Sequence, residues 1–206
     1  MTRLILTRHG RSEANLTHVF AGHTDAPLSP LGKEQAELLA RRLYETEKID
    51  VIYASDLSRT VETARPTAER FGLPIKTDPA LREIFAGAWE NLTFDELMQK
   101  YRVDRERWTL DLPNARCTGG ESVREVAARM ECALHRIAEE NEGKTVLIST
   151  HWTPLYCAFS FATGTPLEKI RTLPQPTNCS ITIIHYENGK FTPVVINDDA
   201  HIPSYS

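Results

Sequence analysis

The stretch Leu4-Ile5-Leu6-Thr7-Arg8-His9-Gly10 predicts both the fold of this chain and the position of its site. Its first four residues form a short apolar run, which is typical of a buried strand. The run ends at Arg8 and His9, where a polar loop begins. In open α/β sheets, ligands bind at the carboxyl ends of the strands. The stretch therefore predicts a strand that delivers a cation and an imidazole to a binding site.

Two further segments repeat this pattern. Residues 49–54 and residues 145–150 also read as buried strands. The first passes into Ser55-Asp56-Leu57-Ser58-Arg59, and the second ends in Thr150-His151. Because the carboxyl ends of parallel strands meet at one edge of a sheet, we expect two histidines and at least two arginines on the same rim.

Helical signals separate these strands. Ser29-Pro30 predicts an N-cap followed by proline in the first helical turn, and a loop is expected between residues 10 and 29. Capping boxes begin at Thr93 and Ser122. Near the C-terminus, residues 179–186 and 191–196 flank Asn188-Gly189, which predicts a β-hairpin.

Together these signals predict one α/β domain over residues 1–206. We expect three α/β/α layers with a mostly parallel central sheet and one antiparallel edge strand. Strand signals are weak over residues 81–120, which we interpret as a helical cap insertion over one end of the sheet.

Composition limits the possible partners and the compartment. The 206 residues carry a formal net charge of −4, which favours neither nucleic acid nor an anionic membrane as a partner. Only Leu4, Ile5 and Leu6 are strongly apolar before Arg8, so we expect no signal peptide and no membrane span. The four cysteines are widely spaced and form no CxxC pair. We therefore expect a cytoplasmic protein with reduced cysteines.

The predicted cluster suits phosphoryl transfer. Arg8 and Arg59 are suited to phosphoryl oxygens, because guanidinium groups bind them through bidentate hydrogen bonds. A neutral His9 can act as a nucleophile near neutral pH, and a protonated His151 can donate to the transferring group. Glu83, at the start of the cap, is the best candidate for the acid that protonates the leaving alcohol.

The motifs resemble, in order, those of the histidine phosphatase superfamily, also called the phosphoglycerate mutase-like family. The resemblance covers nearly the whole chain: Arg8-His9-Gly10, Ser55 to Thr60, Leu81-Arg82-Glu83, Gly120-Glu121-Ser122 and His151. It implies a phosphohistidine on His9 that water hydrolyses, with Arg8, Arg59 and His151 holding the phosphoryl oxygens and Glu83 protonating the leaving group. It also implies that Asn15 and the backbone at Gly22 line the phosphate pocket.

Three positions depart from the family pattern. Trp152 stands where glycine usually follows the second histidine, and we interpret it as a residue that narrows the pocket or stacks on the substrate. Ala21 replaces a common glutamine and removes a polar group from the rim. Asn91 stands where glycine commonly follows the Trp-Glu pair, so the turn in the cap is expected to differ.

Other charged residues allow two interpretations. Arg11 either reaches the phosphate or solvates its loop. The cap arginines favour a solvated helix face over contacts with an acidic substrate; they are Arg102, Arg105, Arg107 and Arg116. The remaining histidines show no HxH or HExxH spacing, so we expect no metal site and no cofactor.

These observations predict a phosphomonoester hydrolase that acts on a small phosphorylated metabolite. One alternative is a cofactor-dependent phosphoglycerate mutase, although such mutases generally carry an extra shielding segment between the acid motif and the second histidine. An alternative of another class is a non-catalytic module that binds phosphorylated ligands, which would need neither the nucleophile nor the acid. An edge strand near the C-terminus would allow a homodimer.

Overall fold

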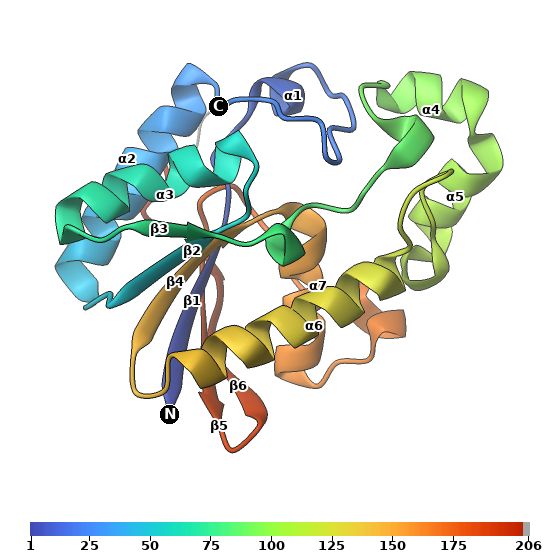
Figure 1. The fold of residues 1–206 in the computed structure, drawn as a ribbon. Helices are drawn as coiled ribbons and strands as arrows, with labels where there is room; N and C mark the ends of the chain where they lie inside the picture. Colours follow the sequence, from blue (N-terminus) through green and yellow to red (C-terminus); the bar gives the residue numbers. More distant parts are fainter. Residues whose placement is uncertain (204–206) are drawn as a thin grey trace.

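The computed structural model describes residues 1–203, whose centre is a mixed sheet in the order β3-β2-β4-β1-β5-β6 (Figure 1). Neighbours among β1 to β4 run parallel, whereas β5 runs antiparallel to β1 and β6 antiparallel to β5. The strands are β1 (Thr2–Arg8), β2 (Val51–Ala54), β3 (Ile75–Thr77), β4 (Thr145–Thr150), β5 (Ile181–Glu187) and β6 (Lys190–Asp198).

Helices and short 3₁₀ segments connect and cover these strands. The α-helices are α1 (Glu13–Leu16), α2 (Pro30–Thr46), α3 (Ser58–Phe71), α4 (Phe94–Lys100), α5 (Arg102–Leu110), α6 (Val123–Glu140) and α7 (Trp152–Thr163). The 3₁₀ segments are η1 (Pro79–Leu81), η2 (Gly87–Trp89), η3 (Leu112–Asn114) and η4 (Leu167–Thr172). No helix within residues 1–203 is long and apolar enough to cross a membrane.

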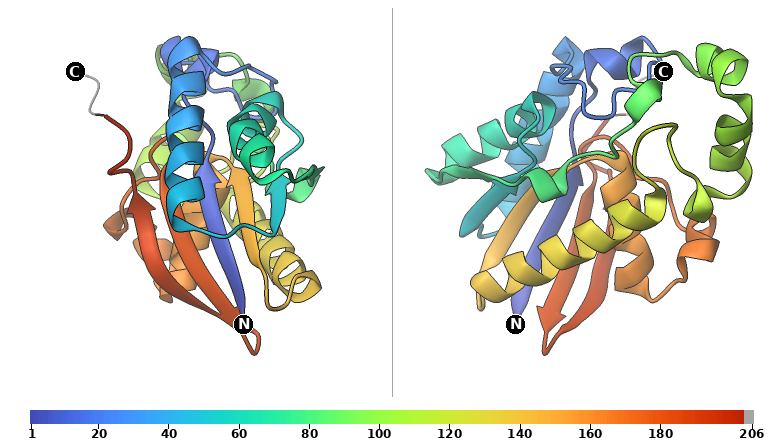
Figure 2. Two further views of the ribbon diagram at one scale, coloured as in Figure 1. Left: turned by 90° about the vertical axis from the view of Figure 1, so that its left-hand side faces the viewer. Right: turned by 45° about the vertical axis from the view of Figure 1, so that its right-hand side comes forward.

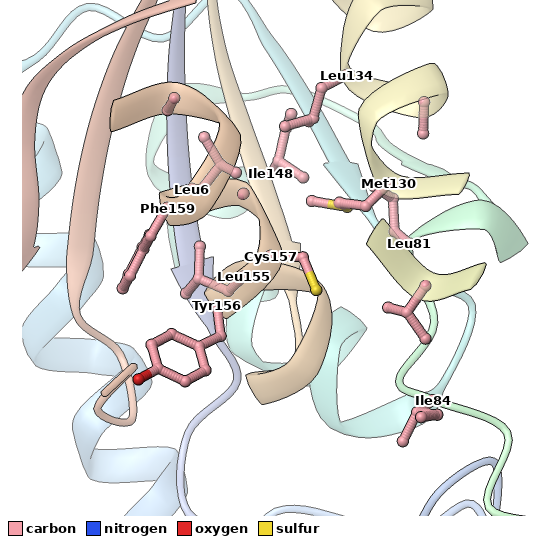
Figure 3. Close-up of a cluster of buried hydrophobic side chains, with 14 of the residues drawn as sticks. Leu6, Leu81, Ile84, Met130, Leu134, Ile148, Leu155, Tyr156, Cys157 and Phe159 are labelled. Atoms are coloured by element: carbon pink, nitrogen blue, oxygen red, sulfur yellow. The ribbon is translucent and has the colours of Figure 1, made fainter. Parts of the chain in front are cut away.

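Alternation along β1 divides the core between the two faces of the sheet. Leu4 and Leu6 join the apolar cluster with α6 and α7, part of which Figure 3 shows around Leu6, Ile148 and Phe159. Ile5 points to the other face and packs in the cluster that contains Leu39 of α2. Because successive side chains of a strand alternate between faces, both layers bury apolar surface against the same strands.

The expected α/β architecture is confirmed, including the hairpin at one edge (Figure 2). Asn188 and Gly189 both adopt positive φ angles, of 51° and 76°, as a tight hairpin turn requires. Ser29 caps α2 by accepting a hydrogen bond from Gly32, and both predicted capping boxes are present.

Two local features differ from the expectation. The predicted loop over residues 10–29 contains α1, which is capped by Ser12 and Asn15. The short strand β3 was not expected, because it has only three residues and one of them, Ile75, is strongly apolar. Within the predicted cap, α4 and α5 lie away from the sheet (Figure 1).

The register places the three predicted site segments at one end of the sheet. Arg8 of β1 lies level with Thr150 of β4, and Ala54 of β2 lies level with Ser149. The residues that follow each strand, His9, Ser55 and His151, therefore emerge side by side. This pairing is what brings distant parts of the sequence into one site.

Candidate active site

A cavity of about 290 Å³ opens at this end of the sheet, beside the carboxyl end of β1. Seven of the residues predicted from the sequence line it: Arg8, His9, Asn15, Gly22, Arg59, Glu83 and Trp152. The wall is completed by residues from the first loop, from the cap and from α7: Ser12, Val19, Phe20, Ala21, Phe94, Arg105, Trp108 and Thr153.

His9 is held in the form that a nucleophile needs. Its Nδ1 lies 2.7 Å from the carbonyl oxygen of Gly10, which can only accept, so Nδ1 carries the proton. The lone pair of the neutral ring is therefore on Nε2. Burial, followed by the charges of Arg59 and Arg8, lowers the pKa of His9 well below its usual value. The ring is neutral at neutral pH, and its free nitrogen can attack phosphorus.

Arg8 supplies a cation with an unused donor. One terminal nitrogen donates to the carbonyl oxygen of Pro176 at 2.9 Å. Its Nε is buried and has no hydrogen-bond partner within residues 1–203. Burial lowers the pKa of Arg8 to about 10, so the guanidinium stays charged at neutral pH. A buried donor without a partner costs free energy, which an anion in the cavity would recover.

Arg59 is almost fully buried, and each of its three nitrogens has an acceptor. Its terminal nitrogens donate to the carbonyl oxygens of Thr24 at 3.0 Å and Gly22 at 2.9 Å. Its Nε donates to Nδ1 of His151 at 3.2 Å. Arg59 thus ties the loop at residues 22–24 to the carboxyl end of β4 and places positive charge at the cavity wall.

Glu90 holds the same loop from the other side. Its carboxylate accepts from the backbone N–H of His23 at 2.9 Å and from the hydroxyl of Thr24 at 2.8 Å. Gly22 has a φ of 54°, and a Cβ there would meet the Ala86 Cβ at 2.6 Å. Only glycine fits this position, because its backbone passes so close to the cap.

His151 lies behind the cavity wall. Its ring is fully buried, and its centroid is 5.2 Å from that of His9. Its Nε2 lies 2.8 Å from the Ser55 hydroxyl, and its Nδ1 accepts from Arg59. Burial and the neighbouring Arg59 lower the pKa of His151 well below its usual value. In this structure Nδ1 of His151 accepts from Arg59, so the ring is neutral and supports Arg59. Its expected role as a donor to the phosphoryl group stays a prediction.

Glu83 reaches the cavity from the segment that follows η1. Its carboxylate accepts from its neighbour Ile84 at 2.8 Å and from the first two N–H groups of α7, Trp152 at 3.0 Å and Thr153 at 3.2 Å. These N–H groups have no intrahelical partner, which makes the start of a helix a suitable anchor for a carboxylate. The anchor sets Glu83 in the same cavity wall as His9 and the first loop.

Arg129 of α6 is a positioning residue that the sequence reading did not single out. Its guanidinium donates to the carbonyl oxygens of Arg82 at 2.7 Å and Glu83 at 2.8 Å, and it pairs with Glu121 at 2.9 Å. It therefore fixes the backbone that carries Glu83. An arginine on an amphipathic helix gives no sequence signal for such a role, because most are solvated.

The structure also shows which of the residues with two possible interpretations line the cavity. Arg11 is not part of the cavity wall; its backbone bonds to Gln35 and Ser29. Arg105 lines the cavity, contrary to the solvated face that its spacing favoured, whereas Arg102 is exposed. Asn91 adopts a φ of 63°, which explains why glycine is common there, and its amide donates to Thr24 at 3.1 Å.

The fold and the site together define an α/β protein with a neutral histidine in a cavity wall, beside Arg8 and the buried Arg59. The chain belongs to the histidine phosphatase superfamily (branch 1), whose model matches residues 4–199. Within residues 1–203 the structure places no group of three or more histidine, cysteine, aspartate or glutamate side chains where a metal ion could be held.

Named relatives of this chain include both phosphatases and mutases. Phosphoserine phosphatase 1 of Hydrogenobacter thermophilus is 33% identical, covering 100% of this chain and 96% of its own. A probable phosphoglycerate mutase of Yersinia pestis is 35% identical, with 92% of this chain and 87% of its own covered. The solved structure of Bacillus stearothermophilus YhfR superposes with a TM-score of 0.93 at 34% identity, covering 98% of this chain and 100% of that one.

Proposed function

We propose that this chain is a phosphomonoester hydrolase. It transfers the phosphoryl group of a small phosphorylated metabolite to His9, which becomes a phosphohistidine. The observation that carries the proposal is the hydrogen bond from Nδ1 of His9 to Gly10, which leaves Nε2 as the free nitrogen in the cavity. Arg8 and Arg59 line the same cavity and supply the charge that a phosphoryl group requires.

The reaction proceeds in two displacements. Nε2 of His9 attacks phosphorus while the ester P–O bond breaks, and the leaving oxygen takes its electron pair together with a proton from Glu83. Water then attacks the phosphohistidine, the P–N bond breaks, and Glu83 accepts the proton of that water. Both steps leave the positive charge of Arg8 in place, and Asn15 and the Gly22 backbone complete the phosphate pocket.

A chelator-resistant assay tests this proposal. Wild type should hydrolyse p-nitrophenyl phosphate in excess EDTA, while His9→Ala should lose at least a thousandfold in kcat/KM. Wild type, quenched in alkali, should carry an acid-labile, base-stable phosphoryl group that His9→Ala lacks. Equal turnover in the two proteins would show that His9 is not the nucleophile.

The mutase remains the second candidate, because a relative is named as a probable phosphoglycerate mutase. The two reactions share the phosphohistidine and differ only in the acceptor. Release of inorganic phosphate from 3-phosphoglycerate, without formation of its 2-isomer, would favour the hydrolase. Isomer formation stimulated by a bisphosphoglycerate primer would favour the mutase.

We also propose a cytoplasmic protein that works without metal or cofactor and without nucleic acid or membrane partners, with a homodimer as its assembly. The four cysteines are unpaired in the structure: Cys117, Cys132, Cys157 and Cys179. Strand β6 forms one edge of the sheet and offers a surface for a second copy. Sedimentation equilibrium tests the dimer, and fractionation of cells producing the tagged chain tests its location.

A further inference from the structure

The carbonyl of Gly10, which accepts from Nδ1 of His9 at 2.7 Å, belongs to the most flexible type of residue. A glycine has no Cβ and adopts φ and ψ angles over a wide range. No other residue fits at this position, because a Cβ on Gly10 would collide with the backbone carbonyl of Gly32 in α2. The direction of the Gly10 carbonyl must therefore be set by what holds the peptide groups on either side of it.

The peptide group that joins Gly10 to Arg11 is held by Gln35 of α2. The side-chain oxygen of Gln35 accepts from the backbone N–H of Arg11 at 2.9 Å. A trans peptide is planar, so its N–H and C=O point in opposite directions, and a bond to one sets the direction of the other. Gln35 is only 6% exposed, so it shields this bond from water. It thus fixes the carbonyl to which Nδ1 of His9 donates.

The start of α2 holds this loop independently of Gln35. The carbonyl oxygen of Arg11 accepts from the backbone N–H of Ser29 at 2.9 Å and from its hydroxyl at 2.8 Å. The same hydroxyl accepts from the N–H of Gly32 at 3.1 Å as the helix cap. Loss of the Gln35 acceptor would therefore release one peptide group without detaching the loop from the helix.

The preceding peptide group, between His9 and Gly10, is held at both of its polar atoms. The carbonyl oxygen of His9 accepts from the side-chain amide of Asn178 at 2.7 Å. The N–H of Gly10 donates to the hydroxyl of Thr63 at 2.9 Å, and that hydroxyl donates to the carbonyl of Arg59 at 2.7 Å. Side chains from distant parts of the sequence therefore fix two consecutive peptides beside the nucleophile.

We propose that Gln35 is a positioning residue that selects the tautomer of His9 through the Gly10 carbonyl. Asn178 supports the same arrangement by holding the preceding peptide. The proton of a neutral imidazole is placed by the hydrogen bond that one of its nitrogens makes. If the carbonyl turned away, Nδ1 would lose its acceptor and the proton would be free to move to Nε2. A protonated Nε2 has no lone pair for phosphorus, so the catalytic consequence rests on the proposed function.

Nitrogen NMR of the His9 ring tests the proposal directly. In protein carrying isotope-labelled histidine, a protonated ring nitrogen and one with a lone pair have well-separated chemical shifts. The pair of signals that disappears in His9→Ala identifies His9. For wild type above neutral pH, we expect Nδ1 to be protonated and Nε2 to carry the lone pair.

Gln35→Met keeps the length of the side chain but lacks a strong acceptor. The two nitrogen shifts of His9 should move towards each other in this variant, because exchange between the tautomers averages them. We expect kcat for p-nitrophenyl phosphate to fall by about tenfold or more with KM little changed, since a misplaced proton disables the nucleophile.

Matched variants separate this role from a general effect on the fold. Gln35→Glu keeps an acceptor oxygen at the same distance and should retain the wild-type shifts and most of kcat. Ala40→Gly, in the same helix, should destabilise the protein but leave the shifts of His9 unchanged. Asn178→Ala should move the shifts in the same direction by less, and provides a second test if Gln35→Met does not fold.

The outcomes also distinguish this inference from the proposed function. Wild-type shifts in both Gln35→Met and Asn178→Ala, or an unprotonated Nδ1 in the wild-type ring, would refute it. Equal changes in Ala40→Gly would overturn it as well, because lost stability alone would then explain them. If wild type hydrolyses no phosphomonoester, the proposed phosphatase fails, while the nitrogen shifts still decide whether Gln35 selects the tautomer.

Discussion

Arg59 and His151 share a single buried hydrogen bond, from Nε of the guanidinium to Nδ1 of the imidazole, at 3.2 Å. Because the arginine can only donate, Nδ1 of His151 must accept, and its proton therefore lies on Nε2, facing Ser55. One contact thus sets the tautomer of a histidine and the orientation of a cation, which makes the shape of Arg59 as important as its charge.

Arg59→Lys should therefore be disruptive despite keeping the charge. An ammonium group cannot reach the Thr24 carbonyl, the Gly22 carbonyl and His151 together, so buried acceptors lose their donor. We expect the free energy of unfolding to fall by about 2 kcal/mol and kcat/KM to fall on the order of a hundredfold. Urea unfolding and phosphatase assays measure the two effects. An exposed control, Arg70→Lys, should change neither, and wild-type values in Arg59→Lys would refute the argument.

Arg129→Gln should reveal its role through the leaving group. If Arg129 positions Glu83 as the acid, the variant should lose much kcat/KM for alkyl phosphates, because their leaving alcohol needs a proton. It should lose little kcat/KM for p-nitrophenyl phosphate, whose leaving group needs no proton. We expect at least a tenfold difference between the two losses. Arg124→Gln on the same helix, where Arg124 is exposed, provides the control. An equal loss for both substrates would mean that Arg129 stabilises the fold without positioning Glu83.

The pH dependence of stability should report the buried His9. Its pKa is well below the ordinary 6.5 in the folded protein, so the unfolded chain binds a proton that the folded chain does not. The contribution of neutral His9 to the free energy of unfolding is fully present above about pH 6.5. It is lost as the pH falls towards the pKa of His9 in the folded protein. Between these limits, His9→Ala should lower the slope of unfolding free energy against pH by about 1.4 kcal/mol per unit. Parallel curves for wild type and His9→Ala, from urea titrations at several pH values, would contradict the shift.

Gly22→Ala should be more disruptive than the same substitution at another glycine with a positive φ angle. Gly22 and Gly164 have φ angles of 54° and 68°, but only at Gly22 would a Cβ collide with another side chain, that of Ala86. We expect Gly164→Ala to cost about 1 kcal/mol for backbone strain alone. Gly22→Ala should cost at least twice as much and also reduce activity, because the Gly22 carbonyl holds Arg59. Thermal unfolding and kinetics of the two variants compare them directly, and equal losses would argue against the clash.

The sequence was sufficient to predict the strand ends but not the links between them. Arg8 and His9 were identifiable because they directly follow an apolar run, and Glu83 because it stands at the start of the predicted cap. Arg129 was not identifiable, and Arg105 could not be distinguished from the other cap arginines, since their contacts depend on how α6 and α5 turn towards distant segments. An arginine that clamps a backbone and one that faces solvent occupy the same kind of helical position.

At the start of α7, the backbone of Trp152 anchors Glu83 and its side chain lines the cavity, so the two roles do not depend on each other. Trp152 holds Glu83 through its backbone N–H, which every residue except proline possesses, while its side chain faces the cavity. The side chain at this position can therefore change without disturbing the position of Glu83. A library of substitutions at Trp152 would be a direct route to new substrate preferences in this scaffold, with the chemistry left intact.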